Sequence, residues 1–147
     1  MISQMCIDDV KEVVRIEKEN FTLPYEEKQY LYELEDNLCA QLYVLKKEDV
    51  IVGYIDFWIT FESCQLCKIA VDKKYQQKGY GKQLMEFMFN KVKTECETIF
   101  LEVRESNQKA RDFYEGFDFW EINKRKSYYT NPTEDGIIMG KILVGGE

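Results

Sequence analysis

Apolar and polar residues follow two different periods along the chain. Four stretches repeat apolar residues every three or four positions, as an amphipathic helix does. The helices that this spacing predicts cover residues 8–19, 25–38, 79–95 and 107–115. Short runs rich in β-branched and aromatic residues lie between and after them, which is typical of strands. The predicted strands cover residues 40–45, 50–59, 64–71, 99–103, 117–122 and 136–143.

The order of these elements predicts the fold class. A helical hairpin comes first, a β-rich segment follows, and strand–helix–strand units complete the chain. The polar residues Lys46 to Asp49 separate the first two predicted strands and suggest a hairpin turn. Strand–helix–strand crossovers imply a mixed sheet with helices on both faces. We therefore expect a single three-layer α/β domain over residues 1–147.

Composition and charge exclude several classes of function. The chain has 147 residues, 45% of them hydrophobic, and no apolar stretch approaches the roughly 18 residues that a membrane helix needs. The first residues lack the basic and apolar regions of a signal peptide. A formal net charge of −7 disfavours a nucleic-acid binder and suits a cationic partner. We expect a soluble cytoplasmic protein that binds neither membranes nor nucleic acid.

The side chains available for chemistry are also limited. The chain has no histidine, so acid–base chemistry must come from carboxylate, tyrosine, lysine, thiol or water. Five scattered cysteines indicate reduced thiols rather than disulfides. Cys64 and Cys67 form a Cys-x-x-Cys pair, but a tetrahedral zinc site would need a second pair or histidines. We expect no metal, and a redox role of this pair stays open beside that of ordinary strand cysteines.

One segment combines glycine and lysine at the start of the longest predicted helix. Gly79 and Gly81 lie where the strand-to-helix loop ends, and without β-carbons a ligand can approach the free N–H groups of the first helical turn. Four lysines make this part of an acidic protein basic: Lys73, Lys74, Lys78 and Lys82. The segment therefore predicts a site for an anionic ligand such as a pyrophosphate.

The glycine spacing fits neither common nucleotide motif. Leu84 occupies the third glycine position of a Gly-x-Gly-x-x-Gly dinucleotide fingerprint. Gln83 follows Gly81 and Lys82 where a P-loop has serine or threonine. A Rossmann domain and a P-loop nucleotidase are therefore disfavoured.

Gln76, Gly79 and Gly81 match the Gln/Arg-x-x-Gly-x-Gly/Ala pattern of the GNAT acetyltransferases. The chain resembles the RimI branch of that superfamily over nearly its whole length; this branch acetylates the N-terminal alanine of a ribosomal protein. The similar segments are Phe-x-x-Pro-Tyr at 21–25, Ile-Ala-Val-Asp at 69–72, Leu-Glu-Val-Arg-x-Ser-Asn at 101–107, Phe-Tyr-Glu at 113–115 and Arg-Lys-Ser-Tyr-Tyr at 125–129. The resemblance implies the GNAT fold, with six to seven mostly antiparallel strands and about four helices on both faces.

The resemblance also implies acetyl-CoA as co-substrate. Backbone groups of residues 69–71 would pair with the pantetheine arm, and N–H groups of residues 77–82 would hold the pyrophosphate. Two positions depart from the family pattern: Gln77 replaces a basic residue, and Asp118 replaces a turn glycine, although aspartate tolerates the left-handed conformation. The expected cofactor-binding residues are Ile69, Ala70, Val71, Gln76, Gln77, Lys78, Gly79, Tyr80, Gly81, Lys82 and Asn107.

By the same resemblance, Glu102 is the general base and Tyr114 the general acid. A carboxylate within an apolar strand suits removal of a proton from an ammonium, directly or through a water, and a neutral phenol suits protonation of the departing CoA thiolate. Periodicity alone leaves another interpretation open. Glu102 could be a solvent-facing residue paired with Arg104 or Lys93, and Tyr114 an aromatic of the core or of an interface.

The acceptor is expected across the sheet from the cofactor, between the first helical hairpin and the loop that joins the last two strands. Aromatic and proline residues of these segments could line a narrow channel for an extended peptide, or could only close the core. Acids such as Glu134 and Asp135 lie nearby in the sequence and could attract a cationic terminus. The expected acceptor-binding residues are Phe21, Pro24, Tyr25, Tyr128 and Tyr129.

These features together predict an acetyl-CoA-dependent N-acetyltransferase acting on the N-terminus of a protein, as a monomer or weak homodimer. One alternative keeps the chemistry and takes a small-molecule amine, such as a polyamine or an amino sugar. A second alternative is a non-catalytic module that only binds acetyl-CoA. Turnover with peptides or with free amines separates these three functions.

Overall fold

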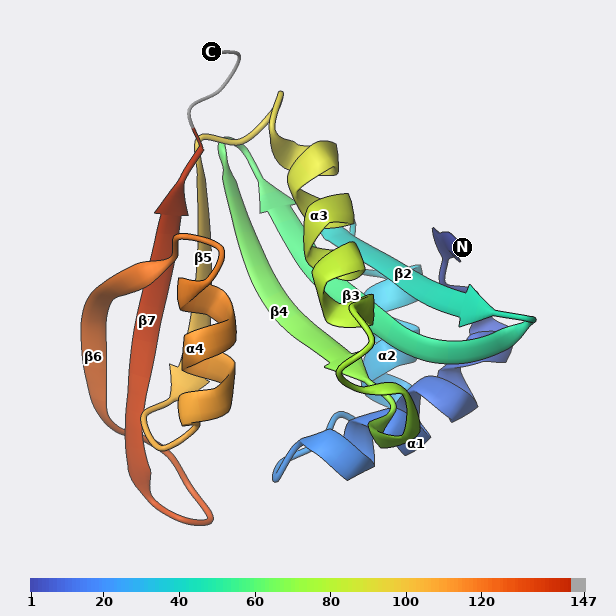
Figure 1. Cartoon of the computed structure of the whole chain (residues 1–147), viewed down its shortest axis with the longest axis horizontal. Helices are drawn as coiled ribbons and strands as arrows, with labels where there is room; N and C mark the ends of the chain where they lie inside the picture. The colour runs from blue at the N-terminus through green and yellow to red at the C-terminus, as the bar shows by residue number, and fades with distance from the viewer. Residues whose placement is uncertain (144–147) are drawn as a thin grey trace.

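Seven strands form one sheet in the order β1-β2-β3-β4-β5-β7-β6 (Figure 1). The computed structural model describes residues 1–143. All neighbouring strands pair antiparallel except β4 and β5, which are parallel, so the expected mixed and mostly antiparallel sheet is confirmed. The strands are β1 (Ile2–Gln4), β2 (Ala40–Lys47), β3 (Val50–Thr60), β4 (Ser63–Val71), β5 (Thr98–Arg104), β6 (Trp120–Tyr129) and β7 (Glu134–Ile142).

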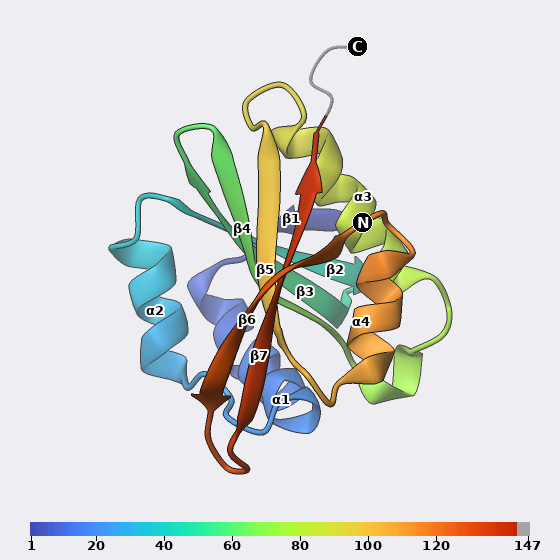
Figure 2. The ribbon, with the colours of Figure 1, turned by 90° about the vertical axis from the view of Figure 1, so that its left-hand side faces the viewer.

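Four α-helices cover the two faces of the sheet, as the resemblance implied (Figures 1 and 2). They are α1 (Val10–Asn20), α2 (Glu27–Glu35), α3 (Tyr80–Val92) and α4 (Gln108–Glu115). Short 3-10 turns precede α1 at Ile7–Asp9 and follow β4 at Lys73–Tyr75. No helix within residues 1–143 is long and apolar enough to cross a membrane.

Successive side chains of β3 point to opposite faces of the sheet, so the core consists of two clusters. Ile55 and Phe57 point toward α3 and pack with its buried Leu84 and Met88. Tyr54 points to the opposite face, where it joins residues of α1 and α2. Because α1 and α3 each present buried residues at a spacing of three or four positions, one stripe of each of these two helices closes one face of the sheet.

Two strands differ from the sequence-based expectation. The predicted strand at 117–122 overlaps β6 only at residues 120–122, because β6 begins at Trp120 and runs through the basic residues to Tyr129. Phe117 and Phe119 instead close the turn after α4 and pack on Phe89 of α3. Nothing in the sequence analysis anticipated β1, whose three residues are held only by pairing with the distant β2. Asp118 adopts φ 70°, as expected for a residue in the glycine position of this turn.

A buried carboxylate joins α1 to the sheet and to the loop before α2. Glu17 is fully buried and accepts hydrogen bonds from the hydroxyls of Tyr30 (2.6 Å) and Tyr54. It also accepts from the backbone N–H of Tyr25 at 2.9 Å and pairs with the Lys68 ammonium at 2.9 Å. A buried charge with four donors is fully satisfied, so Glu17 fixes the start of α2 against β3 and β4.

A second buried carboxyl group lies on the same face of β3. Neither side-chain oxygen of Asp56 has a hydrogen-bond partner within residues 1–143. Burial, and then the neighbouring Glu33 carboxylate, raise the pKa of Asp56 to about 9. Glu33 itself accepts from the Trp58 indole and the Asn37 amide, both at 2.7 Å. Burial and the Glu33 carboxylate therefore favour the neutral form of the Asp56 carboxyl group.

Candidate active site

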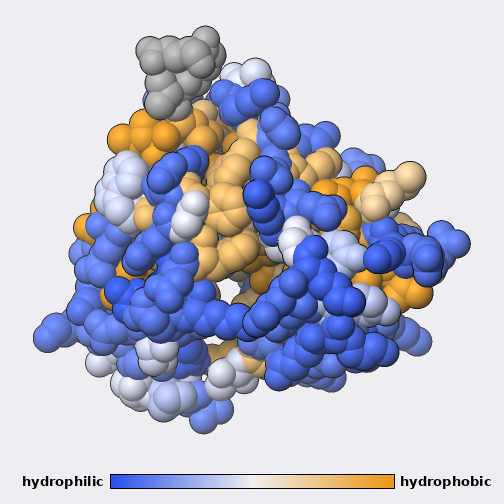
Figure 3. Space-filling model, viewed as in Figure 1, coloured by the Kyte–Doolittle hydropathy of each residue, from blue (hydrophilic) through white to orange (hydrophobic). Residues whose placement is uncertain are grey.

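The sheet opens between β4 and β5. These strands pair over only three residues each, Ser63–Gln65 with Thr98–Phe100, and then separate (Figure 1). A bulge in β4 shifts the register with β3 between Asp56 and Phe57, just where the separation begins. Bulges bend a strand and increase its twist, so this one directs the end of β4 away from β5. The space-filling view in Figure 3 shows the molecule hollowed between the two halves of the sheet.

The separated part of β4 presents a free strand edge to this opening. Asp72 donates its backbone N–H to Val52 at 2.8 Å, and the antiparallel register continues with Gly53 opposite Val71. In such a ladder alternate residues turn their backbone groups to opposite edges. The N–H and C=O groups of Ile69 and Val71 therefore point away from β3, into the opening.

Asp72 anchors the loop that follows. Its buried carboxylate accepts from the Lys74 N–H at 3.0 Å and from the Arg15 guanidinium at 2.6 Å. Burial by itself would raise the pKa of Asp72, but the hydrogen bonds from Arg15 and Lys74 outweigh it and hold this pKa below its usual value. The carboxylate thus ties α1 to the turn that leads into α3.

Replacing Asp72 by asparagine should lower the free energy of unfolding by about 1–3 kcal/mol at pH 7. Because the pKa of Asp72 is depressed in the folded protein, its contribution is complete above the unfolded pKa of 3.8 and falls as the pH drops through the folded value. Urea unfolding of both proteins at pH 7 and at pH 3 measures their free energies of unfolding. The free-energy difference between wild type and Asp72→Asn should be smaller at pH 3 than at pH 7. An equal difference at both pH values would contradict the role of the ion pair.

The start of α3 is a set of unpaired backbone donors. Gly79 precedes the helix with φ 87°, a left-handed conformation that favours glycine. None of the described residues accepts a hydrogen bond from the N–H groups of Tyr80, Gly81 or Lys82. These donors and the positive end of the helix dipole suit an anion.

A pocket of about 470 Å³ lies between this helix start, the free edge of β4 and α4. All expected cofactor-binding residues except Lys78 line it. Tyr114, proposed from sequence as the acid, and Phe21, assigned to the acceptor side, line it too. Five lining residues were not anticipated: Asn20, Tyr75, Lys109, Ala110 and Phe113.

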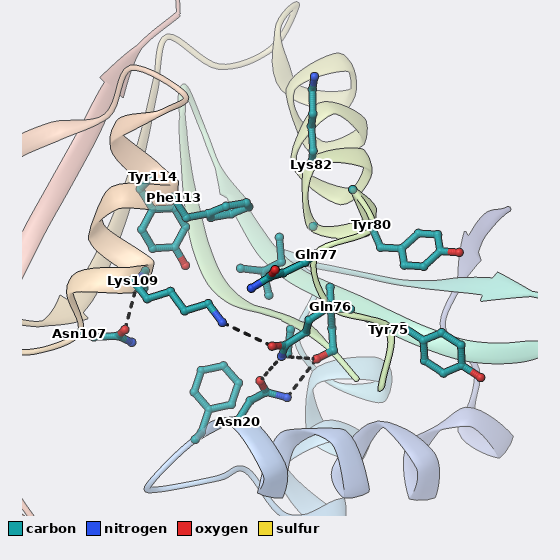
Figure 4. Close-up of a pocket in the computed structure, with 17 residues that line it drawn as sticks. Asn20, Tyr75, Gln76, Gln77, Tyr80, Lys82, Asn107, Lys109, Phe113 and Tyr114 are labelled. Atoms are coloured by element: carbon teal, nitrogen blue, oxygen red, sulfur yellow. Dashed lines mark hydrogen bonds between the residues drawn. The ribbon is translucent and has the colours of Figure 1, made fainter. Parts of the chain in front are cut away.

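Polar side chains connect the walls of this pocket (Figure 4). Gln76 donates to the Val71 carbonyl at 3.0 Å and to the Asn20 side chain at 3.1 Å. Lys109 reaches from α4 to the Gln76 side-chain oxygen at 3.4 Å. Asn107 caps α4 by accepting from the Ala110 N–H at 3.2 Å. A hydrogen-bonded chain therefore runs from α1 across the loop to α4.

Tyr114 reaches the pocket from α4. Its ring packs against Phe113 and Phe119, with ring centroids 5.5 and 6.0 Å away. Figure 4 shows its hydroxyl directed into the pocket. Burial raises the pKa of Tyr114 well above its usual value, with a smaller contribution from Tyr129. The phenol is therefore protonated at neutral pH.

Glu102 lies on the other face of β5. Its neighbours Leu101 and Val103 are buried in the core beneath α3 and α4, whereas the Glu102 side chain is 21% exposed and does not line the pocket. It pairs with Arg125 of β6 at 3.3 Å, rather than with Arg104 or Lys93. Glu102 and Tyr114 thus approach the opening from opposite faces of the sheet.

The aromatic residues assigned to the acceptor fall into two groups at one end of the opening. Phe21, Pro24 and Tyr25 lie in the loop between α1 and α2, where the Lys68 ammonium is 4.0 and 4.5 Å from the centroids of Phe21 and Tyr25. Tyr128 and Tyr129 end β6 with their rings edge to face. The α1–α2 loop and the β6–β7 turn lie near each other in both Figure 1 and Figure 2.

The other candidate residues have structural partners. Glu134 accepts from the backbone N–H and the hydroxyl of Ser106, and Asp135 accepts from the Ser127 N–H.

The Cys-x-x-Cys pair consists of free thiols: Cys64 and Cys67 both lie in β4, and burial raises the pKa of both. No group of three metal-ligating side chains occurs within residues 1–143.

Comparison with known proteins agrees with this geometry. The model of the Acetyltransferase (GNAT) family matches residues 10–119. The ribosomal protein bS18-alanine N-acetyltransferase of Escherichia coli (strain K12) is 30% identical over 141 residues, which cover 94% of each chain. A relative from Bacillus subtilis (strain 168) is 31% identical over 139 residues, covering 94% of this chain and 92% of the relative.

A solved structure gives the same result. The crystal structure of the ribosomal-protein-S18-alanine N-acetyltransferase from Escherichia coli superposes with a TM-score of 0.88 at 28% identity, covering 97% of this chain and 93% of that one. Both the sequence match and the splayed seven-stranded sheet point to one family. The chain therefore belongs to the GNAT family and is an N-acetyltransferase.

Proposed function

We propose that the pocket between β4, α3 and α4 binds acetyl-CoA. The observation that carries this proposal is the combination of a free strand edge with three unpaired N–H groups at a helix start. The backbone groups of Ile69 and the N–H of Val71 suit the amides of a pantetheine arm, whereas the Val71 carbonyl already accepts from Gln76. The N–H groups of residues 80–82 suit a pyrophosphate. When bound, acetyl-CoA supplies a thioester whose carbonyl carbon an amine can attack.

Replacing Gly81 by valine should raise KM for acetyl-CoA at least about tenfold, since backbone contacts to phosphate need close approach. A β-carbon at Gly81 would lie 3.3 Å from the Phe113 ring, and the valine methyls would extend into the pocket. Gln83→Val is the matched control, because Gln83 is an exposed residue of the same helix outside the pocket. Equal KM values in the two variants would contradict this binding mode.

We assign the two proton transfers to residues on opposite sides of the sheet. Glu102, on the face that carries Tyr128 and Tyr129, would accept a proton from the incoming ammonium, directly or through a water. Tyr114, whose hydroxyl is directed into the pocket, would donate a proton to the departing thiolate sulfur. The separation of the two groups suits a reaction in which cofactor and acceptor enter from opposite faces.

We further propose a protein N-terminus as the acceptor, in the manner of the relatives named for the alanine of ribosomal protein bS18. The α1–α2 loop and the β6–β7 turn would border an extended peptide, with Phe21, Tyr25, Tyr128 and Tyr129 along its path. An acceptor of this kind would be met in the cytoplasm. The acidic net charge favours approach of a cationic acceptor.

Release of free CoA thiol tests the proposal. The enzyme is incubated with acetyl-CoA and three acceptors: a peptide that begins with alanine, the same peptide with a blocked N-terminus, and spermidine. Release that depends on the free N-terminus is expected. Release with spermidine alone would support a small-amine acetyltransferase, and cofactor binding without release would support a non-catalytic module.

A further inference from the structure

Two arginines and two tyrosines form a cluster on the outer face of β5, β7 and β6. The Arg104 guanidinium lies 4.7 Å from the Tyr129 ring centroid, and the Arg125 guanidinium lies 5.0 Å from that of Tyr128. Gly136 lies opposite both arginines in the sheet register. A β-carbon there would be 3.1 Å from Tyr128 and 3.2 Å from Tyr129, so the glycine leaves room for both rings.

The two arginines are held very differently. Arg104 is 16% exposed and donates to the carbonyl oxygens of Pro132 and Thr130, at 3.0 and 2.7 Å. Arg125 is 51% exposed, and within residues 1–143 its one polar contact is the ion pair with Glu102, at 3.3 Å. Arg104 is thus a fixed part of the hairpin turn. Arg125 is a half-exposed counter-ion whose ion pair can open at little cost.

Arg125 pairs with Glu102, the residue that we assign as the general base. The α-amine of a peptide has a pKa of about 8, so much of it arrives at neutral pH as an ammonium. Such a cation would need the Glu102 carboxylate, which Arg125 already neutralises. An ammonium bound at Glu102 beside Arg125 would bring two cations together, and their repulsion favours departure of the half-exposed arginine.

We propose that Arg125 is a placeholder for the acceptor: it pairs with Glu102 in the free enzyme, and the N-terminal ammonium of the acceptor displaces it. This inference rests on the proposed function and makes Arg125 a positioning residue. The Tyr128 ring offers the displaced guanidinium a contact that does not involve Glu102. Exposure of the arginine side chain lets it move without rearrangement of the core.

The dissociation constant of a peptide that begins with alanine, measured by calorimetry on the enzyme saturated with CoA, tests this exchange without turnover. Arg125→Met should bind the peptide about threefold more tightly than wild type, because the competing cation is gone. Arg125→Lys should restore the wild-type value. Lys126→Met removes a charge from the same exposed strand, where no ion pair of Lys126 occurs within residues 1–143, and should leave the constant unchanged.

A double-mutant cycle identifies the partner. On the Glu102→Gln background, Arg125→Met should no longer tighten peptide binding, because there is no carboxylate left to compete for. Weaker or unchanged binding by Arg125→Met in the wild-type background would overturn the proposal, as would an equal gain on both backgrounds. Turnover of Glu102→Gln is read separately: full activity there refutes Glu102 as the base, whatever the binding data show.

Discussion

Replacing Tyr114 by phenylalanine is expected to lower kcat at least about 100-fold, the usual contribution of a general acid. The change removes only the hydroxyl, because the ring keeps its contacts with Phe113 and Phe119. KM for acetyl-CoA should change little. Steady-state release of CoA thiol with an alanine peptide measures both constants.

Tyr75→Phe is the matched control for this prediction. Tyr75 also lines the pocket, but Figure 4 shows its hydroxyl directed away from it. The kcat of the Tyr75→Phe enzyme should stay within about twofold of wild type, since no proton transfer is lost. If Tyr114→Phe retained a similar kcat, the thiolate would have to leave without this proton donor, and the assignment of Tyr114 would be wrong.

The largest effect on stability is expected for Glu17→Ala, which should lower the free energy of unfolding by about 3–5 kcal/mol. The variant leaves the Lys68 ammonium, whose side chain is only 13% exposed, without its carboxylate. It also leaves the buried hydroxyls of Tyr30 and Tyr54 without their acceptor. Urea unfolding followed by circular dichroism measures the loss.

Glu12→Ala controls for the removal of a glutamate from the same helix. Glu12 is 41% exposed and pairs with Arg15, so its loss should cost about 1 kcal/mol or less. Similar losses for the two variants would show that the buried network contributes no more than a surface ion pair. Because the backbone N–H of Tyr25 is also bound by Glu17, a Glu17→Ala protein that still folds should bind peptide more weakly.

The sequence predicted the elements of the core better than those at the edge of the sheet. Helix α3 could be found because its buried residues repeat at helical spacing. Strand β6 was predicted only at residues 120–122, because it is an exposed edge strand and its basic residues 124–126 interrupt the alternation of apolar and polar residues. Strand β1 depends on long-range pairing with β2, which local patterns do not report.

In the candidate active site, too, features with a local sequence pattern were predictable and features that depend on long-range contacts were not. The backbone donors near Gly79 and Gly81 were predictable, because glycines between a strand and a helix indicate close approach of a ligand. Asn20 and Lys109 were not, because single polar residues far apart in the sequence meet only in the folded protein. Lys78 was expected in the pocket because the resemblance assigned the backbone N–H groups of residues 77–82 to the pyrophosphate, yet it lies outside the pocket. The pairing of Glu102 with Arg125 depends on the β5–β7–β6 register, which spacing alone does not give.

Mass spectrometry of intact ribosomal protein bS18 after incubation with acetyl-CoA and the enzyme tests the central claim most directly. We predict one added acetyl group, located on the N-terminal alanine, that forms with the wild-type enzyme and is nearly lost with Tyr114→Phe. An unmodified N-terminus after complete incubation with active wild-type enzyme, or acetyl groups only on lysine side chains, would contradict the proposed acceptor.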